Sequence, residues 1–107
     1  MDVVHYTDPD GQDLIDKWFH TLRDKMAAAR ITTRIRRLKL GLFGDCKYLK
    51  GGVSELRIDY GPGYRIYFAK IGISSILLLC GGNKSTQKRD IEVAERRLKN
   101  WLSQQPE

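Results

Sequence analysis

Several common features are missing from this chain of 107 residues, and each absence narrows what the protein can be. No apolar run reaches the roughly 20 residues that a helix needs to span a bilayer. Residues 1–4 (MDVV) lack the basic region followed by an apolar stretch that marks a signal peptide. We therefore predict a cytoplasmic protein that does not associate with a membrane.

Metal-binding patterns are also missing. Cys46 and Cys80 stand alone rather than in a CxxC pair, and His5 and His20 lie far apart in the sequence. We therefore expect two reduced, buried thiols and no metal or other cofactor. The chain also lacks repeats, linkers and low-complexity segments. Its length and its hydrophobic content of 41% predict one domain, residues 1–107, with its own core.

The charge is unevenly distributed along the chain. The formal net charge is +6, but residues 1–29 carry three basic and six acidic side chains, a balance of −3, so residues 30–107 balance +9. Such asymmetry indicates a polyanionic partner, which could be a nucleic acid, an acidic protein or both.

Apolar periodicity predicts the order of the elements. Residues 3–6 form a candidate strand, and helical spacing of apolar residues predicts a first helix over about 10–26 and a second over 27–40. We expect these two helices to form a hairpin across the sheet, with Trp18 and Phe19 in the core. A last helix begins at Ser85 or Thr86 and continues to about Leu102, with Trp101 packed on the domain.

The most informative stretch lies around the turn Gly61-Pro62-Gly63. Residues 56–60 and 64–68 alternate between apolar and polar side chains, which predicts a β-hairpin. With Tyr60 opposite Tyr64, one face is apolar, and the other carries Arg57, Asp59, Arg65 and Tyr67. This second face is either an ordinary solvated surface or, because arginines on neighbouring strands lie beside a basic loop, a phosphate site.

The next run, residues 76–80 (ILLLC), does not alternate, which predicts a central strand buried on both faces. The segment Gly81-Gly82-Asn83-Lys84 follows it and leads into the last helix. Lys84 would therefore lie near a helix N-terminus, where free N–H groups favour anions. The alternative is a simple turn with a Ser or Thr cap. Together the elements predict an α+β fold: strand, two helices, three-strand antiparallel meander, helix.

Two further groups of basic side chains are candidates for binding. Arg30, Arg34 and Arg37 belong to the densest basic run, which is either a solvated helix face or a surface that binds RNA phosphates. Lys47 and Lys50 precede the Arg57 strand and could reach the same patch. A lysine among other cations can have a lowered pKa and act as a base, although an exposed loop lysine usually does not.

Two segments of the sequence resemble a known protein family. Residues 52–68 (GVSELRIDYGPGYRIYF) and residues 77–91 (LLLCGGNKSTQKRDI) resemble the addiction-module killer branch of the RelE/ParE toxin superfamily, close to its HigB-like members. The resemblance extends over the whole chain. It implies a compact RelE/ParE-like α+β fold and the toxin of a type II toxin-antitoxin system.

The resemblance also implies an activity and partners. The toxin would cleave mRNA in the ribosomal A site without a metal, by attack of a ribose 2′-hydroxyl on the adjacent phosphate. A cognate antitoxin, commonly a HigA-like helix-turn-helix protein, would neutralise it, and operator DNA would be bound only through the antitoxin complex. The alternatives are a ParE-like toxin that inhibits DNA gyrase by protein contact, and an inactive subunit that only joins its antitoxin on DNA.

The resemblance also implies roles for individual residues, by matching this sequence to the family's motif. The GYR context resembles that of the family's third-strand arginine, which implies that Arg65 binds the scissile phosphate, with Arg57 assisting from the neighbouring strand. Lys84 takes the position at which several relatives carry the general acid, while no tyrosine follows it and neither histidine falls in this motif. The remaining candidates are Lys47 or Lys50, as backbone contact or base, and Gln87 or Tyr67, which would orient or stack on a base.

Overall fold

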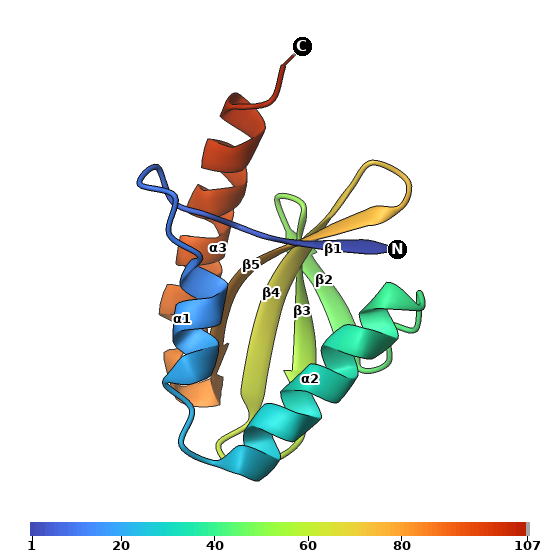
Figure 1. Cartoon of the computed structure of the whole chain (residues 1–107), viewed down its shortest axis with the longest axis vertical. Helices are drawn as coiled ribbons and strands as arrows, with labels where there is room; N and C mark the ends of the chain where they lie inside the picture. Colours follow the sequence, from blue (N-terminus) through green and yellow to red (C-terminus); the bar gives the residue numbers. More distant parts are fainter. Residues whose placement is uncertain (107) are drawn as a thin grey trace.

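The computed structural model describes residues 1–106 and shows an α+β fold with one five-stranded mixed sheet (Figure 1). The strands lie in the order β1-β5-β4-β3-β2; neighbours from β2 to β5 are antiparallel, and β1 runs parallel to β5. Helices α1 and α2 cover one face of the sheet and α3 covers the other. The elements are β1 (Asp2–His5), α1 (Leu14–His20), α2 (Lys25–Lys39), β2 (Cys46–Lys50), β3 (Val53–Ile58), β4 (Tyr64–Ile71), β5 (Ser75–Asn83), the 3-10 turn η1 (Lys84–Thr86) and α3 (Gln87–Ser103).

The meander has four strands, so the prediction of three was wrong. The segment that forms β2 was expected to be a loop that leads into the hairpin, and its sequence, CKYLK, is short and mostly exposed. It forms by pairing with β3 at the edge of the sheet, and this long-range contact has no local signal. Strand β5 is buried on both faces at residues 76–80, as predicted, but β4 rather than β5 is the central strand, because β1 and β2 extend the sheet on either side.

The first two helices differ from the prediction at their junction. A single apolar pattern predicted one helix over about 10–26, but α1 has only seven residues and α2 begins at Lys25. Helix α1 ends at His20 with Thr21 as its C-cap. Asp24 then starts α2 as its N-cap, because its side chain accepts hydrogen bonds from the backbone N–H groups of Met26 and Ala27. Met26, assigned to the first apolar stripe, is 54% exposed. The two helices diverge from this junction instead of forming a closed hairpin (Figure 1).

Two hydrophobic cores hold the layers together. The core beneath α1 and α2 contains Ile31, Ile66 and Phe68, and the core beneath α3 contains Tyr67, Leu79 and Leu98 among its members. As predicted, the large aromatic residues of the helices pack on these cores rather than projecting into solvent; they are Trp18, Phe19 and Trp101. Because side chains alternate along β4, consecutive residues serve different cores.

The predicted hairpin is present with a different register. Arg57 pairs with Arg65 and Glu55 with Tyr67, whereas the tight turn had placed Arg57 opposite Tyr67. The connection is longer than assumed and uses positive φ angles at Gly61 and Gly63. A slip of two residues keeps every side chain on its predicted face, so the separation into an apolar and an arginine-bearing face is correct. None of the described helices is long and apolar enough to span a membrane.

Candidate functional site

A pocket with three cationic side chains lies at the end of the sheet where α3 begins. Arg57 of β3 and Arg65 of β4 are direct cross-strand partners, and Arg65 pairs on its other side with Gly82 of β5. Lys84, the first residue of η1, joins them because the end of β5 lies beside β4. The residues of this arginine pocket are Asp45, Arg57, Asp59, Gly61, Pro62, Gly63, Arg65 and Lys84.

Gly82 permits the helix to begin at this position. A Cβ atom on Gly82 would lie 1.8 Å from Oδ2 of Asp90, which belongs to the first turns of α3 and is buried. Thr86 donates a hydrogen bond to the same carboxylate oxygen. The absence of a side chain at Gly82 therefore lets α3 begin directly beside the strand that carries Arg65.

Glu55 lies behind the two arginines and was not predicted as a site residue. Its side chain is 2% exposed, and its Oε1 lies 3.8 Å from Nε of Arg65 and 4.0 Å from Nε of Arg57. Its other oxygen, Oε2, accepts a hydrogen bond of 2.6 Å from Nε2 of Gln87. A buried carboxylate beside two guanidinium groups offsets their mutual repulsion. The signal in the sequence was the i, i+2 spacing of Glu55 and Arg57, which places both on one face of a strand.

Arg65 is held more firmly than Arg57. Nη1 of Arg65 donates to the carbonyl oxygens of Gly63 at 3.1 Å and Tyr64 at 3.2 Å, and its side chain is 13% exposed. Arg57 is 38% exposed, and its Nη2 lies 3.0 Å from Oδ1 of Asp45. An exposed ion pair of this kind is weak, so an anion can displace Asp45 from Arg57 at low cost. Arg65 is thus the fixed cation of the pocket and Arg57 the exchangeable one.

Tyr67 and Gln87 are not available for base stacking in this structure. Tyr67 is 0% exposed beneath α3, and its hydroxyl forms no hydrogen bond with the described residues. Burial, together with the charges of Glu55 and Asp90, raises the pKa of Tyr67 well above its ordinary value. The expectation that Tyr67 lies on an open face overlooked α3, which covers that part of the sheet. Gln87 is engaged with Glu55 as described above.

Lys47 and Lys50 lie away from the arginine pocket. Both are on β2 and line a separate hollow against α3, where Nζ of Lys50 lies 3.8 Å from Oε1 of Glu95. Lys47 pairs in register with Glu55, one strand further toward the edge than the arginines. Because Lys47 and Lys50 are close to Arg57 in the sequence, we expected all three to form one basic patch. The chain instead reverses direction at Gly51 and Gly52, so the two lysines lie on the edge strand β2.

The arginines of α2 form a second basic surface with mixed roles. Arg34 donates to three backbone carbonyl oxygens, those of Arg57, Phe43 and Asp45, so it supports the edge of β3 instead of a ligand. Arg30 lies over the ring of Tyr60 at 4.8 Å, and both Arg30 and Arg37 are exposed. These three arginines line one hollow with Asp59, which also lines the arginine pocket. The two basic surfaces therefore meet at Asp59.

Comparison with known protein families assigns the chain to one of them. The family model described as "Phage derived protein Gp49-like (DUF891)" matches residues 17–99. The chain belongs to this family. The matched range contains every candidate residue of the arginine pocket, of β2 and of α2. A Haemophilus influenzae (strain ATCC 51907 / DSM 11121 / KW20 / Rd) protein named "Uncharacterized protein" is 48% identical over 80 residues, which cover 75% of this chain and 81% of that protein.

Proposed function

We propose that this Gp49-like chain is the toxin of a type II toxin-antitoxin system and cleaves mRNA on the ribosome without a metal. The pocket in which Arg57 and Arg65 lie side by side, with Lys84 at its mouth, carries the proposal. Membership of a phage-derived family supports a toxin-like role. The observed order of strand, two helices, antiparallel strands and helix is compatible with the RelE/ParE-like topology that the sequence resemblance implies.

The two arginines would bind the scissile phosphate. Negative charge accumulates on the phosphoryl oxygens as the 2′-oxygen attacks, and cations that are already positioned stabilise this charge without reorganising. Glu55 supports this positioning by charge, because its buried Oε1 lies 3.8 Å from Nε of Arg65 and 4.0 Å from Nε of Arg57. Arg57 would exchange Asp45 for a phosphate oxygen on binding. Arg30 and Arg37 of α2 would contact the phosphates of the same strand beyond Asp59, without reading its bases.

Proton transfer can be assigned to two exposed side chains of the pocket. The carboxylate of Asp59 takes the proton of the ribose 2′-hydroxyl, and the 2′-oxygen then forms a bond to phosphorus. The bond between phosphorus and the 5′-oxygen breaks, and the ammonium group of Lys84 donates a proton to that leaving oxygen. The products are a 2′,3′-cyclic phosphate and a 5′-hydroxyl. Asp59 is preferred to Asp45 because it lies where the pocket meets the basic surface of α2 along which the RNA would run, and to Lys47 or Lys50 because both line another hollow.

Induced expression followed by mapping of 5′-hydroxyl ends within translated frames tests the proposal. The wild-type chain should create new in-frame ends, and Arg65→Ala should remove them. Arg96→Ala is the matched control, because it removes one exposed arginine of α3 that lines none of these pockets. Growth arrest without new ends would reject the nuclease and favour the ParE-like alternative, in which a protein such as DNA gyrase is the target. No growth arrest would favour the inactive subunit.

The proposed partner is a cognate antitoxin, HigA-like and carrying a helix-turn-helix domain, which would bring the complex to operator DNA. Co-expression with the product of the neighbouring open reading frame and purification through that product checks this pairing. We expect a stable complex and restored growth. A neighbour that neither co-purifies with the chain nor restores growth would contradict the pairing.

A further inference from the structure

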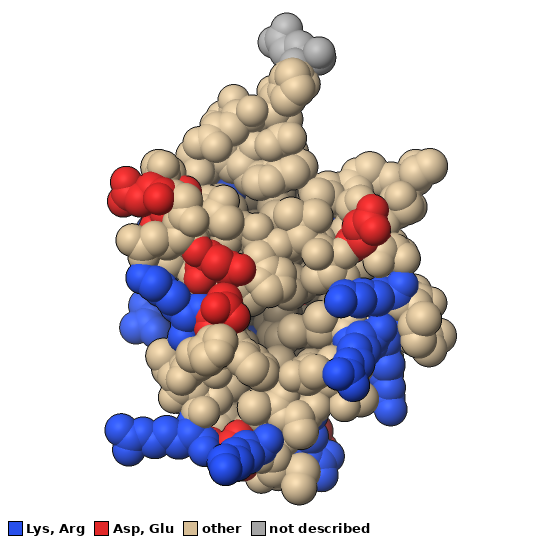
Figure 2. Space-filling view, viewed as in Figure 1, with Lys and Arg blue, Asp and Glu red and all other residues tan. Residues whose placement is uncertain are grey.

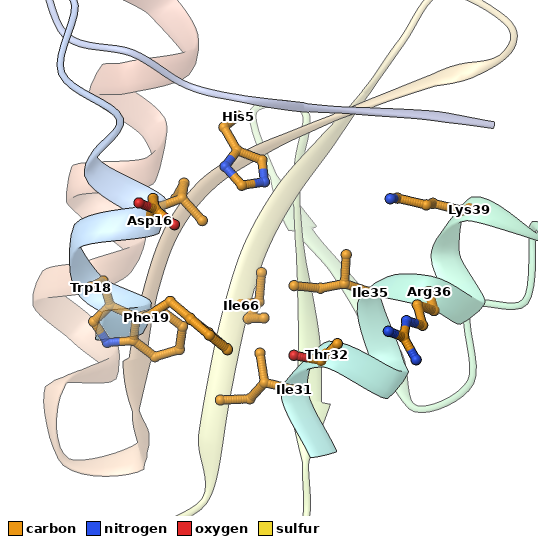
Figure 3. A pocket seen from close by; sticks show the side chains of 11 residues that line it. His5, Asp16, Trp18, Phe19, Ile31, Thr32, Ile35, Arg36, Lys39 and Ile66 are labelled. Atoms are coloured by element: carbon orange, nitrogen blue, oxygen red, sulfur yellow. The ribbon is translucent and has the colours of Figure 1, made fainter. Parts of the chain in front are cut away.

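An apolar groove separates α1 from α2 on the face opposite the arginine pocket (Figure 3). Trp18 and Phe19 form its wall on α1, Ile31 and Ile35 form its wall on α2, and Ile66 of β4 lies between them at its floor. Ile15 completes the apolar lining. The groove exists because the two helices diverge from their junction instead of packing on each other. We call it the interhelix groove.

The surroundings of the groove determine what kind of chain can fill it. Its floor is β4, the central strand, whose backbone is paired with β3 on one side and β5 on the other. An extended peptide on this floor could therefore find no free strand edge to pair with, and the edge strand β1 lines the groove only through His5. Backbone N–H and C=O groups that are covered by apolar surface must be satisfied elsewhere. A helix satisfies them internally, so the groove suits an amphipathic helix.

Charges along the rim define the polarity of that helix. Arg36 and Lys39 line the α2 side, are exposed, and form no ion pair with any described residue. On the α1 side the rim has Asp16 and His5, and His5 is bonded to Asp13 at 2.8 Å. Figure 2 shows basic side chains gathered over the end of α2 and acidic ones over the segment that leads to α1, with further charges of the opposite sign beside each group. The α2 edge therefore favours acidic groups.

A second copy of the chain does not supply such a helix. Within residues 1–106, α2 carries six basic and no acidic side chains, and α3 carries five basic and three acidic ones. Helix α1 has one of each and only seven residues. Each of the two longer helices would bring more positive charge to Arg36 and Lys39. The occupant must therefore come from a different protein.

We propose that the interhelix groove docks an amphipathic α-helix of a partner protein, with an apolar stripe on the groove and an acidic edge facing Arg36 and Lys39. The groove and the arginine pocket lie on opposite faces of the sheet. A bound helix would thus leave the arginine pocket open. The proposal rests on the groove alone and does not require the nuclease activity.

Trp18 provides a direct reporter for the test. The chain has two tryptophans, so Trp101→Phe leaves Trp18 as the only one, inside the groove. The probe is a side-chain-stapled helical peptide of about 16 residues with leucines at i, i+4 and i+7 and glutamates along one edge. The control peptide has lysines in place of the glutamates. We expect the glutamate peptide to shift Trp18 emission and to bind about tenfold more tightly than the lysine peptide at low salt.

A charge reversal on the protein completes the experiment. Arg36→Glu with Lys39→Glu should reverse the preference between the two peptides. Arg96→Glu with Lys99→Glu, an equal change of charge on exposed residues of α3 that do not line the groove, should keep it. Circular dichroism checks the folding of each variant, and calorimetry on the unmodified chain checks the ranking without Trp101→Phe.

Each other outcome overturns the proposal. Equal affinity for both peptides would reject the acidic edge, and unchanged Trp18 emission with both would reject the groove as the docking site. Reversal by the α3 control pair as well would show that only net charge matters. Concentration-dependent dimers that are disrupted by Ile35→Asp would assign the groove to a second copy of the chain.

Discussion

The two faces of the sheet carry two kinds of surface made from consecutive residues. Arg65 lies in the arginine pocket, and its neighbour Ile66 lies at the floor of the interhelix groove. The pocket is polar, and its two arginines lie against Glu55, Asp45 and backbone carbonyls. The groove is apolar, and its cations at the rim have no partner among the described residues. A pre-positioned charge cluster suits chemistry on a phosphate, whereas an apolar groove with unpaired charges at its rim suits recognition of another chain.

The strongest way to break this comparison is to remove Arg65. Arg65→Ala should lower mRNA cleavage by about 10²-fold to 10³-fold, because a fixed charge donor to the developing phosphoryl charge is lost. The same variant should bind the glutamate peptide as the wild type does, since the groove lies on the other face. Quantitative mapping of 5′ ends and Trp18 fluorescence measure the two effects. Loss of both activities together would show that the faces are not independent, and Arg96→Ala should affect neither.

The adjacent glycines Gly81 and Gly82 sharpen the comparison, because they face opposite sides of the sheet. A Cβ atom on Gly82 would lie 1.8 Å from the Asp90 carboxylate, and one on Gly81 would lie 2.3 Å from the ring of Trp18. Gly82→Ala should lower the free energy of unfolding by about 1–3 kcal/mol, because Asp90 is buried and bonded to Thr86. Gly81→Ala should cost less, because the half-buried Trp18 can move outward.

Urea denaturation gives both free energies, and the Trp18 emission of the folded proteins, measured in the Trp101→Phe background, identifies the face that is disturbed. Gly81→Ala should change this emission, and Gly82→Ala should leave it near that of the wild type. A larger loss of stability for Gly81→Ala than for Gly82→Ala would contradict the assignment of the more rigid packing to the α3 side.

A smaller effect is expected at Asp45, which occupies Arg57 in the absence of ligand. Asp45→Asn should tighten the binding of a short 2′-O-methyl RNA by about two- to fivefold, since an exposed ion pair contributes at most about 1 kcal/mol. Fluorescence anisotropy measures this affinity, and the 2′-O-methyl group prevents cleavage. Asp10→Asn removes an exposed carboxylate that forms no ion pair with described residues, and it should have less effect. An equal increase in RNA affinity in both variants would show that the effect of Asp45→Asn comes from the change in net charge alone.

The smallest effect concerns how α2, one wall of the groove, begins. The Asp24 carboxylate accepts hydrogen bonds from the Tyr60 hydroxyl and from the first N–H groups of α2, and these bonds hold the pKa of Asp24 below its ordinary value. Because the pKa is lower in the folded state, the charged form stabilises the fold above the unfolded pKa of about 3.9, and this contribution is lost as the pH falls further.

Melting temperatures between about pH 5 and pH 2 test this linkage. Asp24→Asn keeps a capping oxygen but has no charge to lose, so its melting temperature should fall less over this range than that of the wild type. Asp10→Asn should follow the wild-type curve. A steeper fall for Asp24→Asn than for the wild type would contradict the direction of the shift.

Local patterns predicted the elements whose signals are contained within a few residues. The hairpin, the last helix, the burial of residues 76–80 on both faces and the packing of Trp18 and Trp101 were all predicted correctly. The patterns failed where contacts with residues far apart in the sequence determine the local structure. Strand β2 exists only through its pairing with β3, and the apolar stripe that predicted one long helix continues across the cap at Asp24. Glu55 was missed because the alternating run was counted from Leu56.

The sequence by itself determined which face each side chain of the hairpin takes, because alternation along a strand is a property of the backbone and survives a register slip of two residues. It also determined where cations are concentrated along the chain. Only the tertiary structure brought Lys84 to Arg65, placed Lys47 and Lys50 in another hollow, turned Arg34 inward and opened the groove above Ile66. These outcomes depend on the order of strands and on the angle between two helices, which are set by packing between residues far apart in the chain.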